Sequence, residues 1–211
     1  MGVFLSVLTL IVLGLVFFAV PPAEGLGYYV RIAFFHIPVA WVSVLAFLLS
    51  AFWGAKYLRG GSWAADAKSA AAAQLGFIFV ILATVSGAVF SKLTWGAYWN
   101  WDPRQTTIFV LLLIYGAYLT LRSAMPAGRL RAKTAAVYSL FSFLTVPFLV
   151  FIIPRMYFSL HPSPVINGSG LAMDNIMVAV LMAALLDVTG IFYYCWKRQT
   201  VRLLAGEEEQ V

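Results

Sequence analysis

Residues 95–102 read WGAYWNWD, a run of three tryptophans, one tyrosine and one carboxylate that is followed at once by Pro103. The run lies between two apolar segments, at roughly 70–91 and 106–121. Tryptophan and tyrosine collect at membrane interfaces, but an anchoring belt needs only a few of them at staggered positions. The density of the run and its interruption by Gly96 favour a built loop that offers flat faces and a few polar groups to a flat apolar ligand. An ordinary aromatic belt is the alternative interpretation.

The composition around this run is that of a membrane protein. The 211 residues are 63% hydrophobic and 10% charged, with a mean hydropathy of +0.91. Soluble domains are about 45–50% apolar and about 25% charged. The net charge is +6, but the basic residues lie in short connections between apolar runs, which argues against a nucleic-acid partner. Cys195 is the single cysteine, so a disulfide framework and a CxxC thiol pair are both excluded.

Apolar segments long enough to cross a bilayer, about 20 residues each, recur along the chain. They are 3–20, 29–55, 70–91, 106–121, 134–153 and 173–196. We therefore expect an all-α, polytopic bundle of six transmembrane helices, a single domain over 1–211, with its tryptophan-rich loop at 92–105. The first segment has no preceding basic residue and no following A-x-A site, so a retained helix is expected; a cleaved signal peptide is the alternative.

Basic residues predict the orientation of this bundle. Ten lie in one set of connections: Lys56, Arg59, Lys68, Arg122, Arg129, Arg131, Lys133, Lys197, Arg198 and Arg202. Four lie in the opposite set: Arg31, Lys92, Arg104 and Arg155. The positive-inside rule makes the first set cytoplasmic, together with both termini. The tryptophan-rich loop is then expected outside.

The chain has two histidines, and the predicted topology places both on the side of this loop. His36 lies in FFHIP, near the outer end of the second segment, and His161 lies in SLHPSP, after the fifth. Neutral imidazole is a common iron ligand, and two imidazoles can bind haem iron from opposite faces. A porphyrin between them could be covered by the aromatic loop. Taken singly, each histidine also has an ordinary structural interpretation.

Charged residues near the loop suit such a ligand. Arginine recognises carboxylates with two parallel hydrogen bonds, so Arg31, Arg104 and Arg155 are candidates for contacts with haem propionates. Snorkelling to lipid phosphates is the alternative for each. Asp102 is expected to pair with a nearby cation or to cap the following helix. No catalytic role is expected for it.

The run WGAYWNWD closely resembles the tryptophan-rich WWD motif of the haem-handling proteins of cytochrome c maturation. That superfamily places one histidine on each side of the motif, in outer loops or helix ends, where His36 and His161 occur. Six spans in a chain of this length look like the CcmC family, whose relatives CcmF and CcsA are larger. Tyr98 departs from many copies of the motif, which carry tryptophan there, but it keeps a flat face.

The resemblance implies a function and a set of site residues. Proteins of the CcmC family hold haem b at the outer, periplasmic face of the bacterial inner membrane and deliver it to the haem chaperone CcmE. Their partners are the ABC-type subunits CcmA and CcmB and the small membrane protein CcmD. Such a protein is a haem transfer factor and not an enzyme. The implied axial ligands are His36 and His161, and the implied binding loop comprises Trp95, Gly96, Tyr98, Trp99, Trp101 and Asp102.

Two other functions remain as alternatives. A bis-histidine haem b electron-transfer protein would generally carry both ligands within facing helices, whereas His161 is flanked by prolines. A transporter subunit would usually show midplane polar residues and broken helices in related halves. Asp187, in LLDVTG, is the single such residue, and we expect it to make an interhelical hydrogen bond to a Thr or Ser.

Overall fold

A computed structural model describes residues 2–161, 166–167, 170–171 and 173–208 of the chain. The helices are α1 (Gly2–Phe18), α2 (Ala33–Gly60), α3 (Trp63–Trp95), α4 (Pro103–Ala124), α5 (Arg129–Pro147), α6 (Ile153–Met156) and α7 (Asn175–Glu208). A 3₁₀ turn, η1 (Tyr28–Ile32), precedes α2, and a π-helical turn, η2 (Phe148–Ile152), joins α5 to α6. Two short strands, β1 (Ile166–Asn167) and β2 (Gly170–Leu171), pair antiparallel with Ile166 opposite Leu171.

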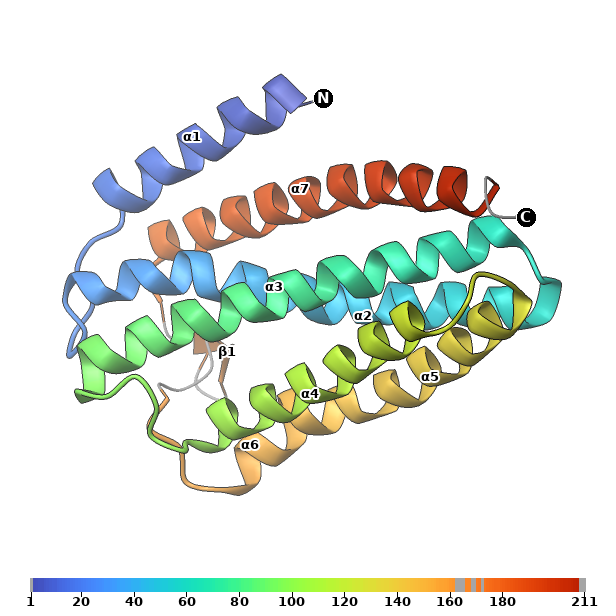
Figure 1. The fold of residues 1–211 in the computed structure, drawn as a ribbon. Helices are drawn as coiled ribbons and strands as arrows, with labels where there is room; N and C mark the ends of the chain where they lie inside the picture. The colour runs from blue at the N-terminus through green and yellow to red at the C-terminus, as the bar shows by residue number, and fades with distance from the viewer. Residues whose placement is uncertain (1, 162–165, 168–169, 172, 209–211) are drawn as a thin grey trace.

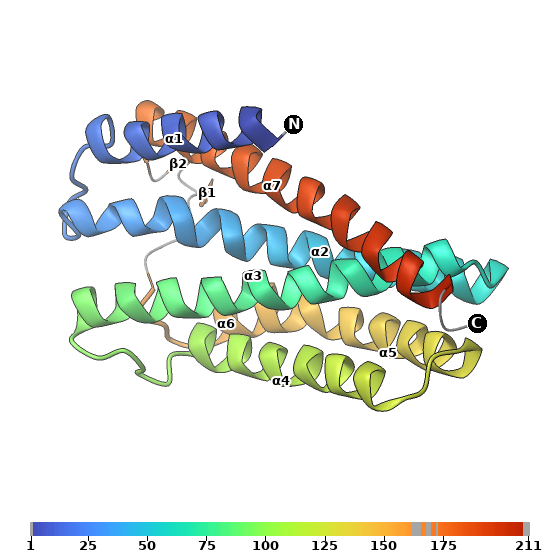
Figure 2. The same cartoon turned by 45° about the horizontal axis from the view of Figure 1, so that its top comes forward.

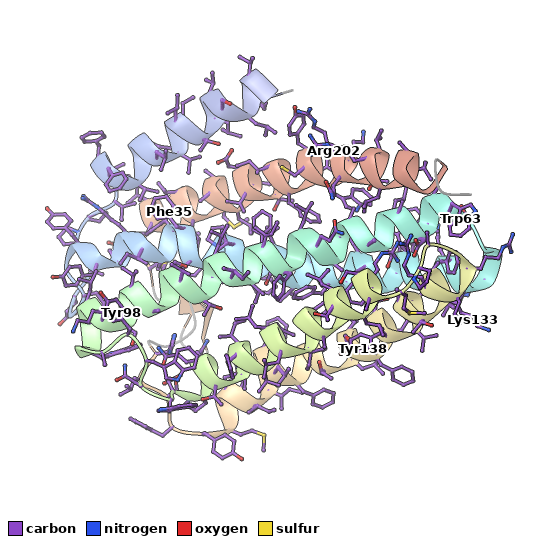
Figure 3. The ribbon with its side chains drawn as sticks, in the orientation of Figure 1. Phe35, Trp63, Tyr98, Lys133, Tyr138 and Arg202 are labelled. Atoms are coloured by element: carbon purple, nitrogen blue, oxygen red, sulfur yellow. The ribbon has the colours of Figure 1, made fainter. Side chains whose placement is uncertain are left out.

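The long helices lie side by side in one bundle, as Figures 1 and 2 show from two directions. Helix α2 occupies the middle and packs against α3, α5 and α7, while α1 packs against α7. The connections are spread over the two ends of the bundle. Trp63 and Lys133 lie at one end and Tyr98 at the opposite end (Figure 3). The tryptophan-rich loop is thus separated along the helix axes from the basic connection before α5.

Among the residues that the structure describes, five helical segments are long and apolar enough to cross a membrane, which establishes a polytopic α-helical membrane protein. They are Tyr28–Gly60, Trp63–Trp95, Pro103–Ala124, Arg129–Met156 and Asn175–Gly206. Helix α1 is apolar but shorter, with 17 residues. At about 1.5 Å per residue it is roughly 26 Å long, less than the hydrocarbon core of about 30 Å. The expected six spans thus correspond to five long helices and one short N-terminal helix.

The long helices extend further than the apolar segments predicted. Helix α3 begins at Trp63 and not near residue 70 because its polar first turns are buried inside the bundle. Asp66 is 2% exposed, and both of its carboxylate oxygens accept hydrogen bonds from Arg122 of α4, at 2.8 and 2.5 Å. A paired buried charge is compatible with a helix interior but lowers the local hydropathy. Hydropathy alone therefore placed the helix start too late.

The tryptophan-rich loop is shorter than the predicted 92–105. Helix α3 continues to Trp95 and ends at Gly96, whose φ of 84° is left-handed and whose N–H donates to the Lys92 carbonyl at 3.1 Å. Helix α4 begins directly after Asp102, with Pro103 in its first position. The connection between the two helices therefore consists of residues 96–102 alone.

Close packing in the middle of the bundle depends on one small residue. The Phe47 ring of α2 stacks on Tyr115 of α4, with ring centroids 3.5 Å apart. On α3, a Cβ added at Gly76 would lie 2.6 Å from Phe47 Cε1, so a side chain there would displace the ring. Gly76 thus allows α2 and α3 to approach closely in the middle of the bundle.

Candidate functional site

A cavity at the loop end of the bundle brings the two histidines together. Its lining includes His36 from α2, Trp99 from the loop, Arg104 from the start of α4 and His161 from the segment after α6. Apolar side chains, among them Ile108 and Leu149, complete the lining. A concave lining of apolar side chains with a few convergent polar groups is typical of binding sites for small molecules and cofactors.

A second cavity, of about 680 Å³, adjoins the first. Both cavities are lined by His36, Gly87 and His161. The first also has Arg104 and other polar side chains in its lining, whereas the second is lined by apolar residues apart from the two histidines and Gly87. The histidines thus lie between a polar and an apolar compartment, an arrangement that suits an amphipathic planar ligand.

The ring of His36 is held by two neighbouring residues of α3. Its Nδ1 lies 3.1 Å from Ser86 Oγ, whose own proton points to the Leu82 carbonyl at 2.7 Å. With its proton on that carbonyl, the hydroxyl oxygen can accept from Nδ1, and the tautomer with the proton on Nδ1 leaves Nε2 with its lone pair. A Cβ at Gly87 would lie 3.0 Å from His36 Cε1, so the ring lies directly against the helix backbone. These two contacts hold the His36 ring in place.

The ring of His161 is fixed by the tryptophan-rich loop. Its centroid lies 5.2 Å from that of Trp95, and its Nδ1 lies 3.2 Å from Asp102 Oδ1. Burial lowers the pKa of His161 from 6.5 to about 4, although the Asp102 carboxylate acts in the opposite direction. The imidazole is therefore neutral at pH 7, which is the form that binds metals.

Asp102 caps α4, as the sequence predicted, and it also accepts hydrogen bonds from the segment before His161. Its Oδ1 accepts the Arg104 backbone N–H at 2.9 Å, which confirms the cap. Its Oδ2 accepts the Ser159 hydroxyl at 2.9 Å and the Leu160 N–H at 2.7 Å. Burial raises the pKa of Asp102, but these donors outweigh it and hold that pKa below its ordinary value. The carboxylate thus joins the loop to the segment that carries His161.

Three polar residues that the sequence analysis missed hold the loop in shape. The Asn100 N–H donates to Gln105 Oε1 at 2.8 Å, and the Asn100 amide donates to Ser91 Oγ at 2.7 Å. Ser91 in turn donates to the Ala97 carbonyl, and Gln105 donates to the Tyr98 carbonyl. Ser91 and Gln105 are buried. In the sequence these three residues are recognisable only as polar residues next to an aromatic run. Their sequence positions do not show which of them hydrogen-bond to one another.

The predicted loop residues face different ways. Trp99 lines the polar cavity, and Trp95 packs on His161. Tyr98 and Trp101 are 59% and 73% exposed and line neither of the two cavities. Trp101 has a left-handed φ of 55°, which is uncommon for a bulky residue and turns its side chain outward. The aromatic run therefore has an inner and an outer face.

The three candidate arginines also differ in position. Arg104 lines the polar cavity, and its buried Nε has no hydrogen-bond partner within the described residues. Arg31 donates to the Val20 carbonyl at 3.1 Å, and its guanidinium lies over the Tyr28 ring. Arg155 donates to the Phe151 carbonyl. Neither Arg31 nor Arg155 lines the two cavities, so Arg104 is the arginine that the fold presents to a ligand.

One further sequence prediction concerns a residue away from this site. Asp187 of α7 accepts a hydrogen bond from Thr9 of α1 at 3.1 Å, which confirms the expected interhelical bond.

Fold and site together define a polytopic α-helical membrane protein with a paired-histidine cavity behind a tryptophan-rich loop. A family model described as CcmC, "Heme exporter protein C", matches residues 1–210. The chain belongs to this family, and the sequence-based family assignment is confirmed.

Individual relatives agree with the family match. Heme exporter protein C of Bradyrhizobium diazoefficiens is 29% identical over 166 residues, which cover 79% of this chain and 63% of that protein. Heme exporter protein C of Rhodobacter capsulatus is 34% identical over 128 residues, or 57% of this chain and 50% of that protein. The cytochrome c biogenesis protein CcsA of Spinacia oleracea is 35% identical over 88 residues, 42% of this chain and 26% of that protein. The chain spans less than two thirds of the length of each of these three proteins.

Proposed function

We propose that the chain binds haem b between His36 and His161 and delivers it to a CcmE-like haem chaperone during the biogenesis of c-type cytochromes. The observation that carries this proposal is that the two histidines line the same two cavities. His36 contacts Ser86 through Nδ1, and His161 contacts Asp102 through Nδ1. The Nε2 atom of each imidazole is therefore available to bind iron. Bis-imidazole ligation is a common way to bind haem iron.

The surroundings of the histidines suit the rest of the haem. Trp99 offers a flat face in the polar cavity, and Arg104 offers an unpartnered guanidinium nitrogen for a propionate. The apolar cavity on the other side of the histidines suits the vinyl and methyl edge of the ring. Arg31 and Arg155 line neither of the two cavities, so they are secondary candidates.

We further propose that the site faces the periplasm of a bacterial inner membrane and that both termini are cytoplasmic. Basic residues support this orientation, since ten lie in the connections at one end of the predicted bundle and four at the other. Helix α1 would be a sixth, short transmembrane span, around which the bilayer would thin locally. The expected partners in the membrane are CcmA/CcmB ABC-type subunits and a CcmD-like small protein.

Delivery is favoured over electron transfer by the place of His161. It lies in the segment between α6 and β1 and not within a helix, so this ligand can leave the iron without disturbing the bundle. Trp101, which precedes Asp102 in the loop and is 73% exposed, offers contact area to a protein partner. A buried electron-transfer haem would resist the loss of an axial ligand.

Co-expression with a CcmE-like chaperone tests the proposal. Haem staining of the chaperone after denaturing electrophoresis should show covalent haem with the wild-type chain and little with His36→Ala or His161→Ala. The variants must be present in the membrane at wild-type amounts for the comparison to count. A chain whose haem cycles redox normally in cells without any such chaperone would instead be a membrane cytochrome.

A further inference from the structure

We propose that Asp102 is a positioning residue for His161: it holds the Nδ1–H of the imidazole and so presents Nε2 to the haem iron. This inference rests on the proposed function. It adds a role for the last residue of the WGAYWNWD run that capping of α4 does not require.

The carboxylate is surrounded by donors. Oδ1 accepts the Arg104 N–H and lies 3.2 Å from His161 Nδ1, while Oδ2 accepts the Leu160 N–H. Asp102 is 4% exposed, so water does not compete freely for these positions. An ionised carboxylate accepts hydrogen bonds but cannot donate one. The tautomer with the proton on Nδ1 is therefore the one that this carboxylate favours.

Asp102 Oδ1 faces the buried Nδ1 of His161 at 3.2 Å. Within the described residues that nitrogen has no well-aligned hydrogen bond to any other group. Trp95 packs against the same ring, with the two ring planes inclined at 57°. The imidazole is thus limited in rotation by the indole and in tautomer by the carboxylate. Both constraints come from the tryptophan-rich loop.

The same carboxylate makes the loop and the histidine segment move together. Ser159 donates to Asp102 and its Oγ accepts the His161 N–H at 3.2 Å, so a short chain of hydrogen bonds leads from α4 to the histidine backbone. Displacing the loop would therefore displace His161. A partner that binds the exposed side of the loop would act on the iron ligand through Asp102.

The two ligands are consequently unequal. His36 has a neutral hydroxyl, Ser86, at its Nδ1, whereas His161 has a carboxylate. A carboxylate at the far nitrogen raises the basicity of a metal-binding imidazole. A more basic ligand stabilises ferric over ferrous iron, so the charge on Asp102 lowers the reduction potential of the haem.

The first test compares Asp102→Asn with the matched variant Ser86→Ala in purified protein. Asparagine keeps an oxygen that can cap α4 but removes the charge. We expect about 10–100-fold weaker haem retention for Asp102→Asn and a reduction potential more positive than that of the wild type. An unchanged potential in Asp102→Asn, or an equal shift in Ser86→Ala, would overturn the inference.

A double variant separates positioning from a general effect on the fold. If Asp102 acts through His161, adding Asp102→Asn to His161→Ala should change neither the remaining haem content nor the potential. An additional loss as large as that in the wild-type background would show that Asp102 acts elsewhere.

The tautomer can be measured without haem. Because the chain has two histidines, ¹⁵N NMR of the ligand-free protein at neutral pH resolves both rings, and His36→Gln assigns them. We expect the Nδ1–H tautomer at His161. The Nε2–H tautomer would overturn the inference even if the protein binds haem, whereas wild-type protein that binds no haem would overturn the proposed function alone.

Discussion

His36 lies against the backbone of Gly87, so closely that a Cβ at residue 87 would be 3.0 Å from the imidazole Cε1. Neighbouring helices approach in this way only where one of them has no side chain. The position of the first proposed iron ligand is thus set by a glycine on another helix. Both residues line both cavities.

Gly87→Val is therefore expected to displace the His36 imidazole from its position in the cavity and to lower the haem content of the purified protein. Gly116→Val is the matched control, since Gly116 is also in a helix interior but a Cβ there meets Phe77 at an ordinary 3.7 Å. Both variants exchange the same residue types inside a helix, so their intrinsic helix-propensity change is the same. Equal haem content in the two variants, measured by pyridine haemochrome, would contradict the role of Gly87.

Replacing either histidine should change the iron coordination. We expect a six-coordinate, low-spin bis-nitrogen spectrum in the wild type and a five-coordinate or empty site in His36→Ala and in His161→Ala. The helices should stay intact, which circular dichroism checks, because neither ring forms part of the apolar core clusters. A wild-type spectrum in the double variant would refute the ligand assignment.

Trp99 and Trp101 should behave differently although they are two residues apart. Trp99→Ala removes flat contact area from the polar cavity, at a cost of about 1–3 kcal/mol in haem binding. Trp101 is 73% exposed, so Trp101→Ala should keep haem but slow its transfer to the chaperone. Haem titration and transfer kinetics measure the two effects. Loss of expression with normal haem content in both variants would favour the aromatic-belt interpretation.

The buried Asp66–Arg122 pair should support the bundle and not the site. Removing one partner leaves an unpaired buried charge, so Arg122→Ala is expected to destabilise the protein by about 3–5 kcal/mol. The double variant Asp66→Ala/Arg122→Ala should lose less than the sum of the two single variants. Thermal unfolding in detergent provides the measurement. Additive losses would show that the two residues contribute independently.

Acidification should weaken both the fold and haem binding through His161. Its pKa is lowered from 6.5 to about 4, so between these values the unfolded chain binds more protons than the folded one. Stability is therefore fully present above about pH 6.5 and declines as the pH falls towards 4. Protonation also removes the lone pair that binds iron. His161→Ala should show a flatter stability profile over this range, and an unchanged profile would contradict the assignment.

The sequence by itself determined the membrane class, most of the long helices and the grouping of both histidines with the tryptophan-rich loop. These features follow from local properties, since hydropathy along a segment and basic residues in a connection do not depend on how helices pack. Cap formation by Asp102 was predictable for the same reason, because the capping residue is adjacent to the helix it caps. Helix ends were less well predicted where polar residues such as Asp66 are buried by pairing.

Only the tertiary structure decided which side chains share a cavity. Helix rotation places His36 against Gly87, and loop dihedrals turn Trp99 inward and Trp101 outward; neither can be read from the order of residues. Arg104 is distinguished from Arg31 because Arg104 lines the polar cavity and Arg31 lines neither cavity. The contact between Asp102 and His161 joins segments far apart in the chain, and it exists because α5, η2 and α6 return the chain to the start of α4.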